Sequence, residues 1–139
     1  MSVNRLSTNL PRNNQPDPVA LVIEDEVLIR MALVETLMDD GYEVIEAASV
    51  DEAHLALACR SDISLIVTDV ETSGITNGFM LARRMARERP KVRIIVVSGR
   101  VAPKSGDLPE GVSFIAKPFS PQTLLFVANR LVQRLSVAA

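Results

Sequence analysis

Carboxylates, a hydroxyl and an ammonium group follow short apolar runs at four places along the chain. The residues are Glu24, Asp25, Asp69, Ser98 and Lys117. Apolar runs this dense indicate strands that are buried on both faces, as in a parallel sheet. The carboxyl ends of the strands in an open α/β sheet meet at a crevice where ligands bind. We therefore expect these side chains to share one crevice.

The carboxylates of this set predict a site for a divalent cation. Carboxylates that crowd together repel one another and stay ionised only with a cation among them. Mg²⁺ suits such a site, because it takes one or two carboxylates with waters and a phosphoryl oxygen. Asp69 could then attack phosphorus and form an aspartyl phosphate. Lys117 would offer a positive charge to the phosphoryl group and Ser98 a hydroxyl. A plainer interpretation is that Asp69 only caps the next helix.

The elements that position these residues alternate between strand and helix. Strands are expected at Val19 to Ile23, Glu43 to Ala47, Leu65 to Asp69, Arg93 to Val97 and Ser113 to Ala116. Helices are expected at about Val27 to Asp40, from a capping box at Ser49 to near Arg60, at about Asn77 to Arg89, and from Pro121 to about Leu135. This alternation predicts a doubly wound α/β fold with a five-stranded parallel sheet of flavodoxin-like order 2-1-3-4-5.

Inward-facing stripes are expected on the first and last helices. They comprise Val27, Met31, Val34 and Met38 on the first and Leu124, Ala128, Leu131 and Leu135 on the last. Gly41 should end the first helix in the left-handed conformation. The arginines of the third helix, at positions 83, 84, 87 and 89, predict a solvated face.

The stretch from Arg100 to Val112 interrupts the alternation where a fourth helix belongs. It contains Pro103, Pro109, Gly106 and Gly111. Proline costs a helix interior about 3 kcal/mol and glycine about 1 kcal/mol. We expect helix four to be shortened to a single turn or replaced by a loop.

Length and composition indicate one domain with an ordinary surface. The chain has 139 residues, of which 15 are Lys or Arg and 17 are Asp or Glu, for a net charge of −2. This balance gives no basic surface for nucleic acid, and no apolar run is long enough to span a membrane. Residues 1–18 are expected to be a disordered tail, followed by a domain over 19–139. The absence of a signal sequence and the single cysteine, Cys59, favour a cytoplasmic location.

Four motifs together resemble those of response-regulator receiver domains, which have the CheY-like fold. They are Ile23-Glu24-Asp25-Glu26, Thr68-Asp69-Val70, Val97-Ser98-Gly99 and Lys117-Pro118-Phe119. The resemblance covers about Val19 to Leu135. It implies a phosphoacceptor of a two-component or phosphorelay system rather than an enzyme. Asp69 would take a phosphoryl group from a sensor histidine kinase or a histidine phosphotransfer protein.

The resemblance also implies a role for each site residue. Asp25 and Asp69 would bind Mg²⁺ directly, together with the backbone carbonyl of Glu71, and Glu24 would reach the metal through water. Lys117 would contact the phosphoryl group, and Ser98 would move to bond it. Phe114 would be the switch aromatic, and Lys117-Pro118 would be a cis peptide.

Some residues depart from the family pattern and leave alternatives open. Thr72-Ser73 replaces the usual Met-Pro pair, although Gly78 still ends that loop, and Phe114 lacks the hydroxyl of a tyrosine. With no output domain expected, the protein could relay phosphate, drain a kinase or bind a target, and it could form a homodimer. The competing interpretations are a small aspartyl-nucleophile phosphatase and a degenerate receiver that only binds.

Overall fold

The computed structural model describes residues 16–70, 78–99 and 108–133. The strands are β1 (Val19–Ile23), β2 (Glu43–Ala47), β3 (Ile63–Asp69), β4 (Arg93–Ser98) and β5 (Val112–Ala116). The helices in these ranges are α2 (Val27–Asp39), α3 (Val50–Cys59), α4 (Gly78–Glu88) and α5 (Pro121–Leu131). All strand pairs are parallel, in the order β2-β1-β3-β4-β5. The predicted fold class and strand order are confirmed.

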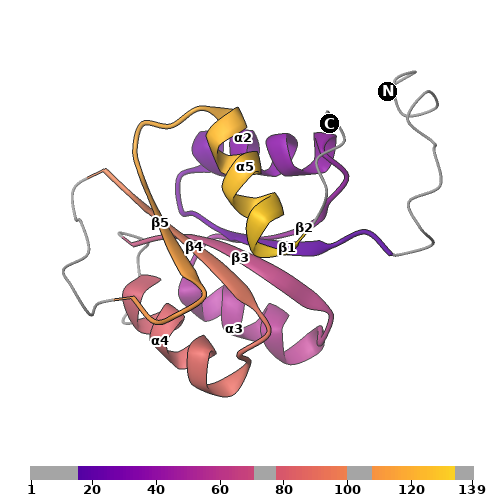
Figure 1. Ribbon diagram of the computed structural model, residues 1–139, viewed down its shortest axis with the longest axis vertical. Helices are drawn as coiled ribbons and strands as arrows, with labels where there is room; N and C mark the ends of the chain where they lie inside the picture. The colour runs from indigo at the N-terminus through magenta and orange to yellow at the C-terminus, as the bar shows by residue number, and fades with distance from the viewer. Residues whose placement is uncertain (1–15, 71–77, 100–107, 134–139) are drawn as a thin grey trace.

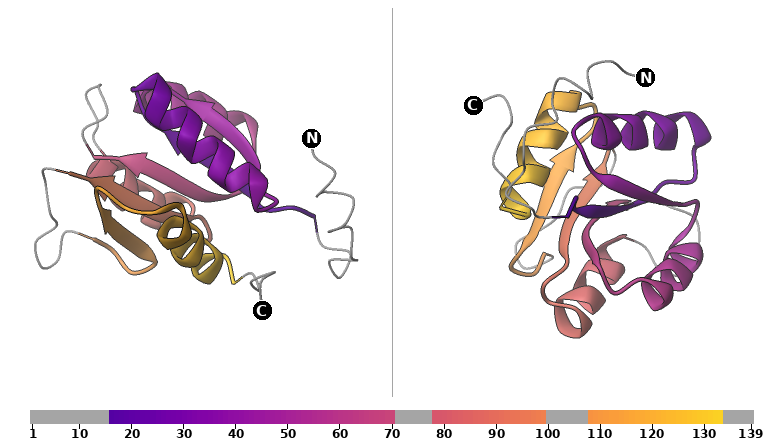
Figure 2. Two further views of the ribbon diagram at one scale, coloured as in Figure 1. Left: turned by 90° about the horizontal axis from the view of Figure 1, so that it is seen from above. Right: turned by 90° about the vertical axis from the view of Figure 1, so that its right-hand side faces the viewer.

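The sheet separates two layers of helices. Helices α2 and α5 cover one face, and α3 and α4 cover the other (Figure 1; Figure 2, right). Along β1, Leu21 and Ile23 belong to the core under α3 and α4, whereas Ala20 and Val22 belong to the core under α2 and α5. This alternation follows from the two-residue period of a strand, and it explains why the run is apolar throughout.

Local capping signals define the helix ends as expected. The Ser49 hydroxyl accepts a hydrogen bond from the Glu52 N–H at 3.2 Å, and the Ser120 hydroxyl accepts one from Thr123 at 3.1 Å. Gly41 has φ +94°, a conformation that glycine adopts without steric cost. Beside it, the Tyr42 hydroxyl donates to Asn129 Oδ1 of α5 at 2.6 Å. Asn129 Nδ2 in turn donates to Asp40 Oδ2 at 3.0 Å, so a chain of hydrogen bonds joins α2 to α5.

The stripe predicted for the first helix is wrong at three of its four positions, whereas Val34 is partly buried and packs against the core under α2 and α5. Val27, Met31 and Met38 are 56%, 57% and 45% exposed, and the buried residues of α2 are Leu33 and Leu37. Apolar residues surround α2 on nearly all sides, so their spacing does not distinguish the inward face. On α5 the predicted stripe is confirmed at Leu124 and Ala128, which are buried.

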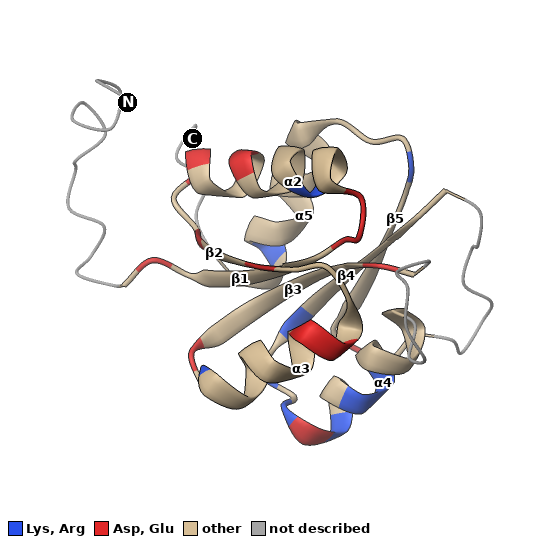
Figure 3. Ribbon diagram, turned by 180° about the vertical axis from the view of Figure 1, so that it is seen from behind, with Lys and Arg blue, Asp and Glu red and all other residues tan. Residues whose placement is uncertain are grey.

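The arginines of α4 follow the prediction except at its end. Basic residues colour the outer face of α4 in Figure 3, where Arg83, Arg84 and Arg87 are exposed. Arg89 instead donates hydrogen bonds to the carbonyl oxygens of Leu57 at 3.0 Å and Arg60 at 3.1 Å. It therefore fastens the residues after α4 to the end of α3, which the expected solvated face did not include.

Several predictions fall on residues outside the described ranges. These are most of the tail, the carbonyl of Glu71, the 100–107 part of the interrupted stretch, and Leu135. The part of that stretch that is described, Leu108 to Gly111, contains no helix. Across the described helices, none combines the length and the apolar character that a membrane crossing requires.

Candidate functional site

The carboxyl ends of four neighbouring strands form the edge that carries the predicted site. Parallel register places Asp69 opposite Val97, and Ser98 opposite Ala116. The ladder continues past the strands, because Lys117 donates its N–H to the Ser98 carbonyl at 2.9 Å. Glu24 likewise donates to Ala47 at 3.0 Å. The backbone at this edge is therefore held by hydrogen bonds on both sides of Asp69.

Lys117 joins two buried carboxylates. Its Nζ lies 2.5 Å from Asp69 Oδ2 and 3.5 Å from Glu24 Oε1. Glu24 is 0% exposed and Asp69 is 5% exposed. A lysine between two buried carboxylates compensates part of the repulsion that would otherwise oppose their ionisation. The structure thus brings the side chains of Glu24, Asp69 and Lys117 together at one edge of the sheet.

The surroundings of Glu24 favour its protonated form. Burial, followed by the neighbouring Asp69 carboxylate, raises the pKa of Glu24 to about 7, against the opposing effects of a hydrogen bond from the Glu26 N–H and the Lys117 charge. Burial alone would lower the pKa of Lys117, but its hydrogen bond to Asp69 and the two negative charges outweigh burial and raise it. Lys117 therefore remains a cation, whereas Glu24 can exchange a proton near neutral pH.

The donor atoms at this edge are compatible with Mg²⁺. Glu24 Oε1 is buried and accepts no hydrogen bond from the described residues; its nearest cation is Lys117 at 3.5 Å. Asp25 follows directly and is exposed. Within the described ranges, no three acidic, histidine or cysteine side chains form a metal centre by themselves. Mg²⁺ does not need one, since it commonly binds through one or two carboxylates and keeps several waters.

Ser98 and Phe114 lie on the neighbouring strands β4 and β5. Ser98 ends β4 and is 2% exposed. Phe114 is half-buried on β5 and packs against the core under α3 and α4. The Lys117-Pro118 peptide is cis, as predicted. Ser98 and Lys117 thus stand at the ends of adjacent strands, and Phe114 lies three residues before Lys117.

Sequence reasoning missed two residues that support the site. Arg30 of α2 donates through Nη1 to the Glu24 carbonyl at 2.7 Å. Gly78 begins α4 so close to β3 that an added Cβ would lie 3.1 Å from Val70 Cα and 3.2 Å from the Asp69 carbonyl oxygen. A lone arginine within the apolar first half of a helix was the available signal for Arg30. No local signal revealed the close approach at Gly78.

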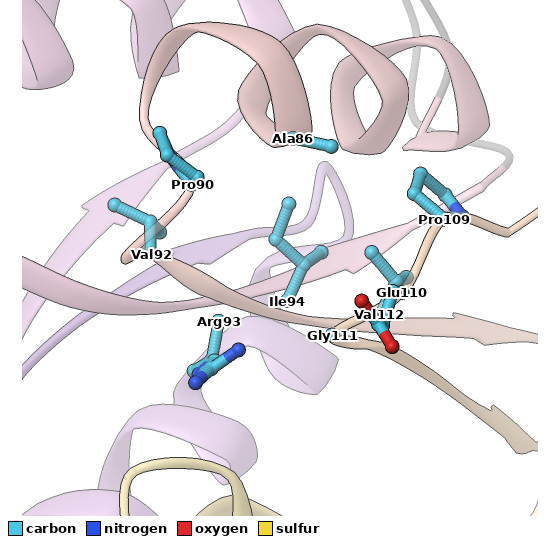
Figure 4. A pocket seen from close by; sticks show the side chains of 9 residues that line it. All are labelled: Ala86, Pro90, Val92, Arg93, Ile94, Pro109, Glu110, Gly111 and Val112. Atoms are coloured by element: carbon cyan, nitrogen blue, oxygen red, sulfur yellow. The ribbon is translucent and has the colours of Figure 1, made fainter.

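A cavity of about 530 Å³ lies away from these residues. It is lined by Ala86 and Pro90 near the end of α4, by Arg93 and Val112 at the starts of β4 and β5, and by Pro109 and Glu110 (Figure 4). These strand starts form the edge of the sheet opposite Asp69. The cavity is therefore separate from the acidic site.

The fold and site define a doubly wound α/β domain with buried carboxylates and a lysine at the carboxyl edge of its sheet. Residues 20–129 match the family described as response regulator receiver domain. The chain belongs to this family, a class of signalling phosphoacceptors in two-component systems rather than of catalytic enzymes.

Individual relatives agree with this assignment. The chain is 35% identical over 120 residues to the aerobic respiration control protein ArcA of Escherichia coli K12, covering 84% of this chain and 49% of the relative. It spans about half the length of the first curated relatives that it matches. A response regulator receiver protein from Sinorhizobium medicae has a TM-score of 0.78 at 24% identity, which shows the fold, over 84% of this chain and 95% of that one. The chemotaxis response regulator CheY4 of Vibrio cholerae has a TM-score of 0.70 at 28% identity, over 83% and 98%.

Proposed function

We propose that this protein accepts a phosphoryl group on Asp69 from a phosphohistidine of a histidine kinase or a histidine phosphotransfer protein. The observation that carries the proposal is the placement of Lys117 Nζ against Asp69 Oδ2, beside the buried carboxylate of Glu24. In this arrangement the Asp69 carboxylate already lies beside a cation, Lys117, which can bind the negatively charged phosphoryl group. Family membership supports the kinase as donor, because receiver domains interact with histidine kinases.

The transfer exchanges one bond for another. A carboxylate oxygen of Asp69 attacks phosphorus, a P–O bond forms, and the P–N bond to the donor imidazole breaks; the departing imidazole takes up a proton. The phosphoryl group brings about two negative charges. Lys117 would turn from the Asp69 carboxylate towards the phosphoryl oxygens, and the Ser98 hydroxyl would donate a further hydrogen bond.

Asp25 and Asp69 would hold Mg²⁺, with Glu24 acting through water and the Glu71 carbonyl as a further ligand. When bound, the ion would neutralise charge that develops on the phosphoryl oxygens. Glu24 and Asp25 could both contribute to holding Mg²⁺, because they occupy consecutive positions on the turn after β1. One side chain of this turn is buried and the next is exposed, so the turn offers oxygens at two depths.

The signal would leave the domain by contact with other proteins. Ser98 and Phe114 would respond together, because they lie on the adjacent strands β4 and β5. Direct binding of a target would use this switch, whereas relay to a second histidine or drainage of a kinase would need only transfer of the phosphoryl group. We infer that the protein works in the cytoplasm, where kinases of this class present their phosphohistidine.

Incubation with acetyl phosphate and Mg²⁺, followed by intact mass measurement, tests the proposal. We expect one phosphoryl adduct on the native chain and none on Asp69→Asn, because an amide is not a nucleophile towards phosphorus. Omitting the divalent metal should suppress the adduct. An adduct of equal yield on Asp69→Asn, or a native chain that never reacts, would contradict the assignment.

A further inference from the structure

Arg30 makes two directed contacts beside the acidic turn. Its Nη1 donates to the Glu24 carbonyl oxygen at 2.7 Å, and its Nε donates to Glu46 Oε1 of β2 at 3.1 Å. The Arg30 side chain is 17% exposed, whereas that of Glu46 is 50% exposed. A planar guanidinium that is held at two points has little freedom to rotate.

The contact on Glu24 adds a hydrogen bond to the backbone of the turn. The Glu24 N–H donates to Ala47, its Oε2 accepts from Glu26, and its carbonyl accepts from Arg30. Fixing that carbonyl fixes the plane of the peptide between Glu24 and Asp25, because the peptide bond is rigid. The direction in which Asp25 leaves the strand then follows from the position of Arg30.

We propose that Arg30 is a positioning residue, which sets the affinity of the Asp69 site for Mg²⁺ by orienting the Glu24-Asp25 peptide. This inference rests on the proposed function. Glu46 supports it by holding the guanidinium in place, and an ion pair that is half exposed contributes little to stability in its own right. The consequence of losing Arg30 should therefore appear in metal binding beyond any loss of stability.

Arg89 provides a matched control at the opposite edge of the sheet. Like Arg30 it donates two hydrogen bonds, here both to backbone carbonyls, those of Leu57 and Arg60, which precede β3. Replacing either arginine by methionine removes a guanidinium and two or more hydrogen bonds while keeping most of the apolar stem. Of these two arginines, Arg30 alone contacts the turn that carries Glu24 and Asp25.

The experiment is an isothermal titration calorimetry measurement, in which Mg²⁺ is added to the unphosphorylated protein. The proteins compared are the native chain, Arg30→Met, Arg30→Lys and Arg89→Met. We expect Arg30→Met to raise the dissociation constant for Mg²⁺ by about tenfold, as loss of a group that orients a metal ligand commonly does. Lysine can reach one acceptor at a time, so Arg30→Lys should raise it by a smaller factor. Arg89→Met should bind Mg²⁺ with the affinity of the native chain, even if its melting temperature falls as far as that of Arg30→Met.

Three outcomes would overturn the inference. If Arg30→Met binds Mg²⁺ with native affinity, the peptide keeps its orientation without the guanidinium. If the methionine variant does not fold, native affinity in Arg30→Lys leads to the same conclusion. Equal losses in Arg30→Met and Arg89→Met would assign the effect to general destabilisation. Tighter Mg²⁺ binding in Arg30→Met would show that the arginine acts as a repelling charge. A native chain that binds no Mg²⁺ and forms no adduct would instead refute the proposed function, and this inference with it.

Discussion

Glu24 is a fully buried carboxylate that shares Lys117 with Asp69. Burial, followed by the neighbouring Asp69 carboxylate, favours the protonated form of Glu24 and raises its pKa to about 7, because Lys117 compensates only part of the negative charge. The metal-free protein therefore carries a proton at this site that the unfolded chain would release at lower pH. Proton binding and folding are linked at this residue.

The linkage predicts that Glu24 destabilises the metal-free protein as the pH rises. The pKa of Glu24 is about 7 in the folded protein, whereas its ordinary value is 4.5, so the folded state binds the proton more tightly. Stability from that proton is fully present below pH 4.5 and is lost as the pH rises through about 7. Relative to Glu24→Gln, the free energy of unfolding of the native chain should fall over this window by an amount on the order of 3 kcal/mol.

Urea unfolding in the presence of a chelator, at about pH 5 and about pH 8, measures the difference in the free energy of unfolding between the native chain and Glu24→Gln. Glu24→Gln should gain relative to the native protein at the higher pH. Adding Mg²⁺ to the native chain should reduce the gain, since the ion favours the ionised carboxylate. A difference that is the same at both pH values would show that Glu24 titrates as it does in water.

Among the elements, those defined by local signals could be predicted from the sequence. Short runs between turn formers predicted β1 and β2 to the residue. Ser49 and Ser120 predicted helix starts, because a cap acts within one turn. The inward face of α2 could not be predicted from a helix that is apolar nearly all round. The contacts of Arg30 with Glu46 and of Arg89 with Leu57 join residues that are distant in sequence, and only the fold brings them together.

The packing of α4 against β3 predicts that residue 78 tolerates little beyond glycine. An added Cβ would meet Val70 Cα at 3.1 Å and the Asp69 carbonyl at 3.2 Å, and these backbone atoms cannot rotate away as a side chain can. Gly78→Val should therefore displace the start of α4 from the end of β3. We expect a loss of stability of about 1–3 kcal/mol, as overpacking usually causes, together with slower formation of the aspartyl phosphate.

Thermal unfolding and the rate of adduct formation with acetyl phosphate check this prediction. Ala86→Val is a suitable control, because Ala86 lies on the same helix beside the cavity at the other edge of the sheet. The control should leave the rate unchanged. Native rates in Gly78→Val would mean that the end of β3 is indifferent to the position of α4.

On the scale of the whole molecule, stability and function are concentrated at different places. Two apolar cores lie on the two faces of the sheet. The neighbouring β1 residues Leu21 and Val22 belong to different cores, Leu21 to the one under α3 and α4 and Val22 to the one under α2 and α5. The proposed site instead lies at the carboxyl edge, where Glu24 and Asp69 are buried together. The repulsion that Lys117 leaves uncompensated at this edge opposes folding, and a bound divalent cation would reduce it.

Mg²⁺ should therefore raise the melting temperature of the whole domain. A ligand that binds only the folded state stabilises it by mass action. Asp25→Ala should remove most of this response, because it deletes a proposed ligand. Asp39→Ala, at the end of α2, removes the same charge from an exposed position and should keep the response.

Differential scanning calorimetry at several Mg²⁺ concentrations makes the comparison. The melting temperature of the native chain and of Asp39→Ala should rise with concentration, and that of Asp25→Ala should stay nearly constant. A rise of the same size in all three proteins would place the stabilising ion at another site.

Tyr42 also has a consequence for the optical properties of the protein. It is the only tyrosine of a chain that has no tryptophan. Its ring is 4% exposed, and its hydroxyl donates to Asn129, far from the carboxyl edge of the sheet. Near-ultraviolet emission therefore originates chiefly at the junction of α2, β2 and α5. This intrinsic fluorophore reports whether the two helices remain together, and a fluorescent reporter of phosphorylation would have to be introduced beside Asp69.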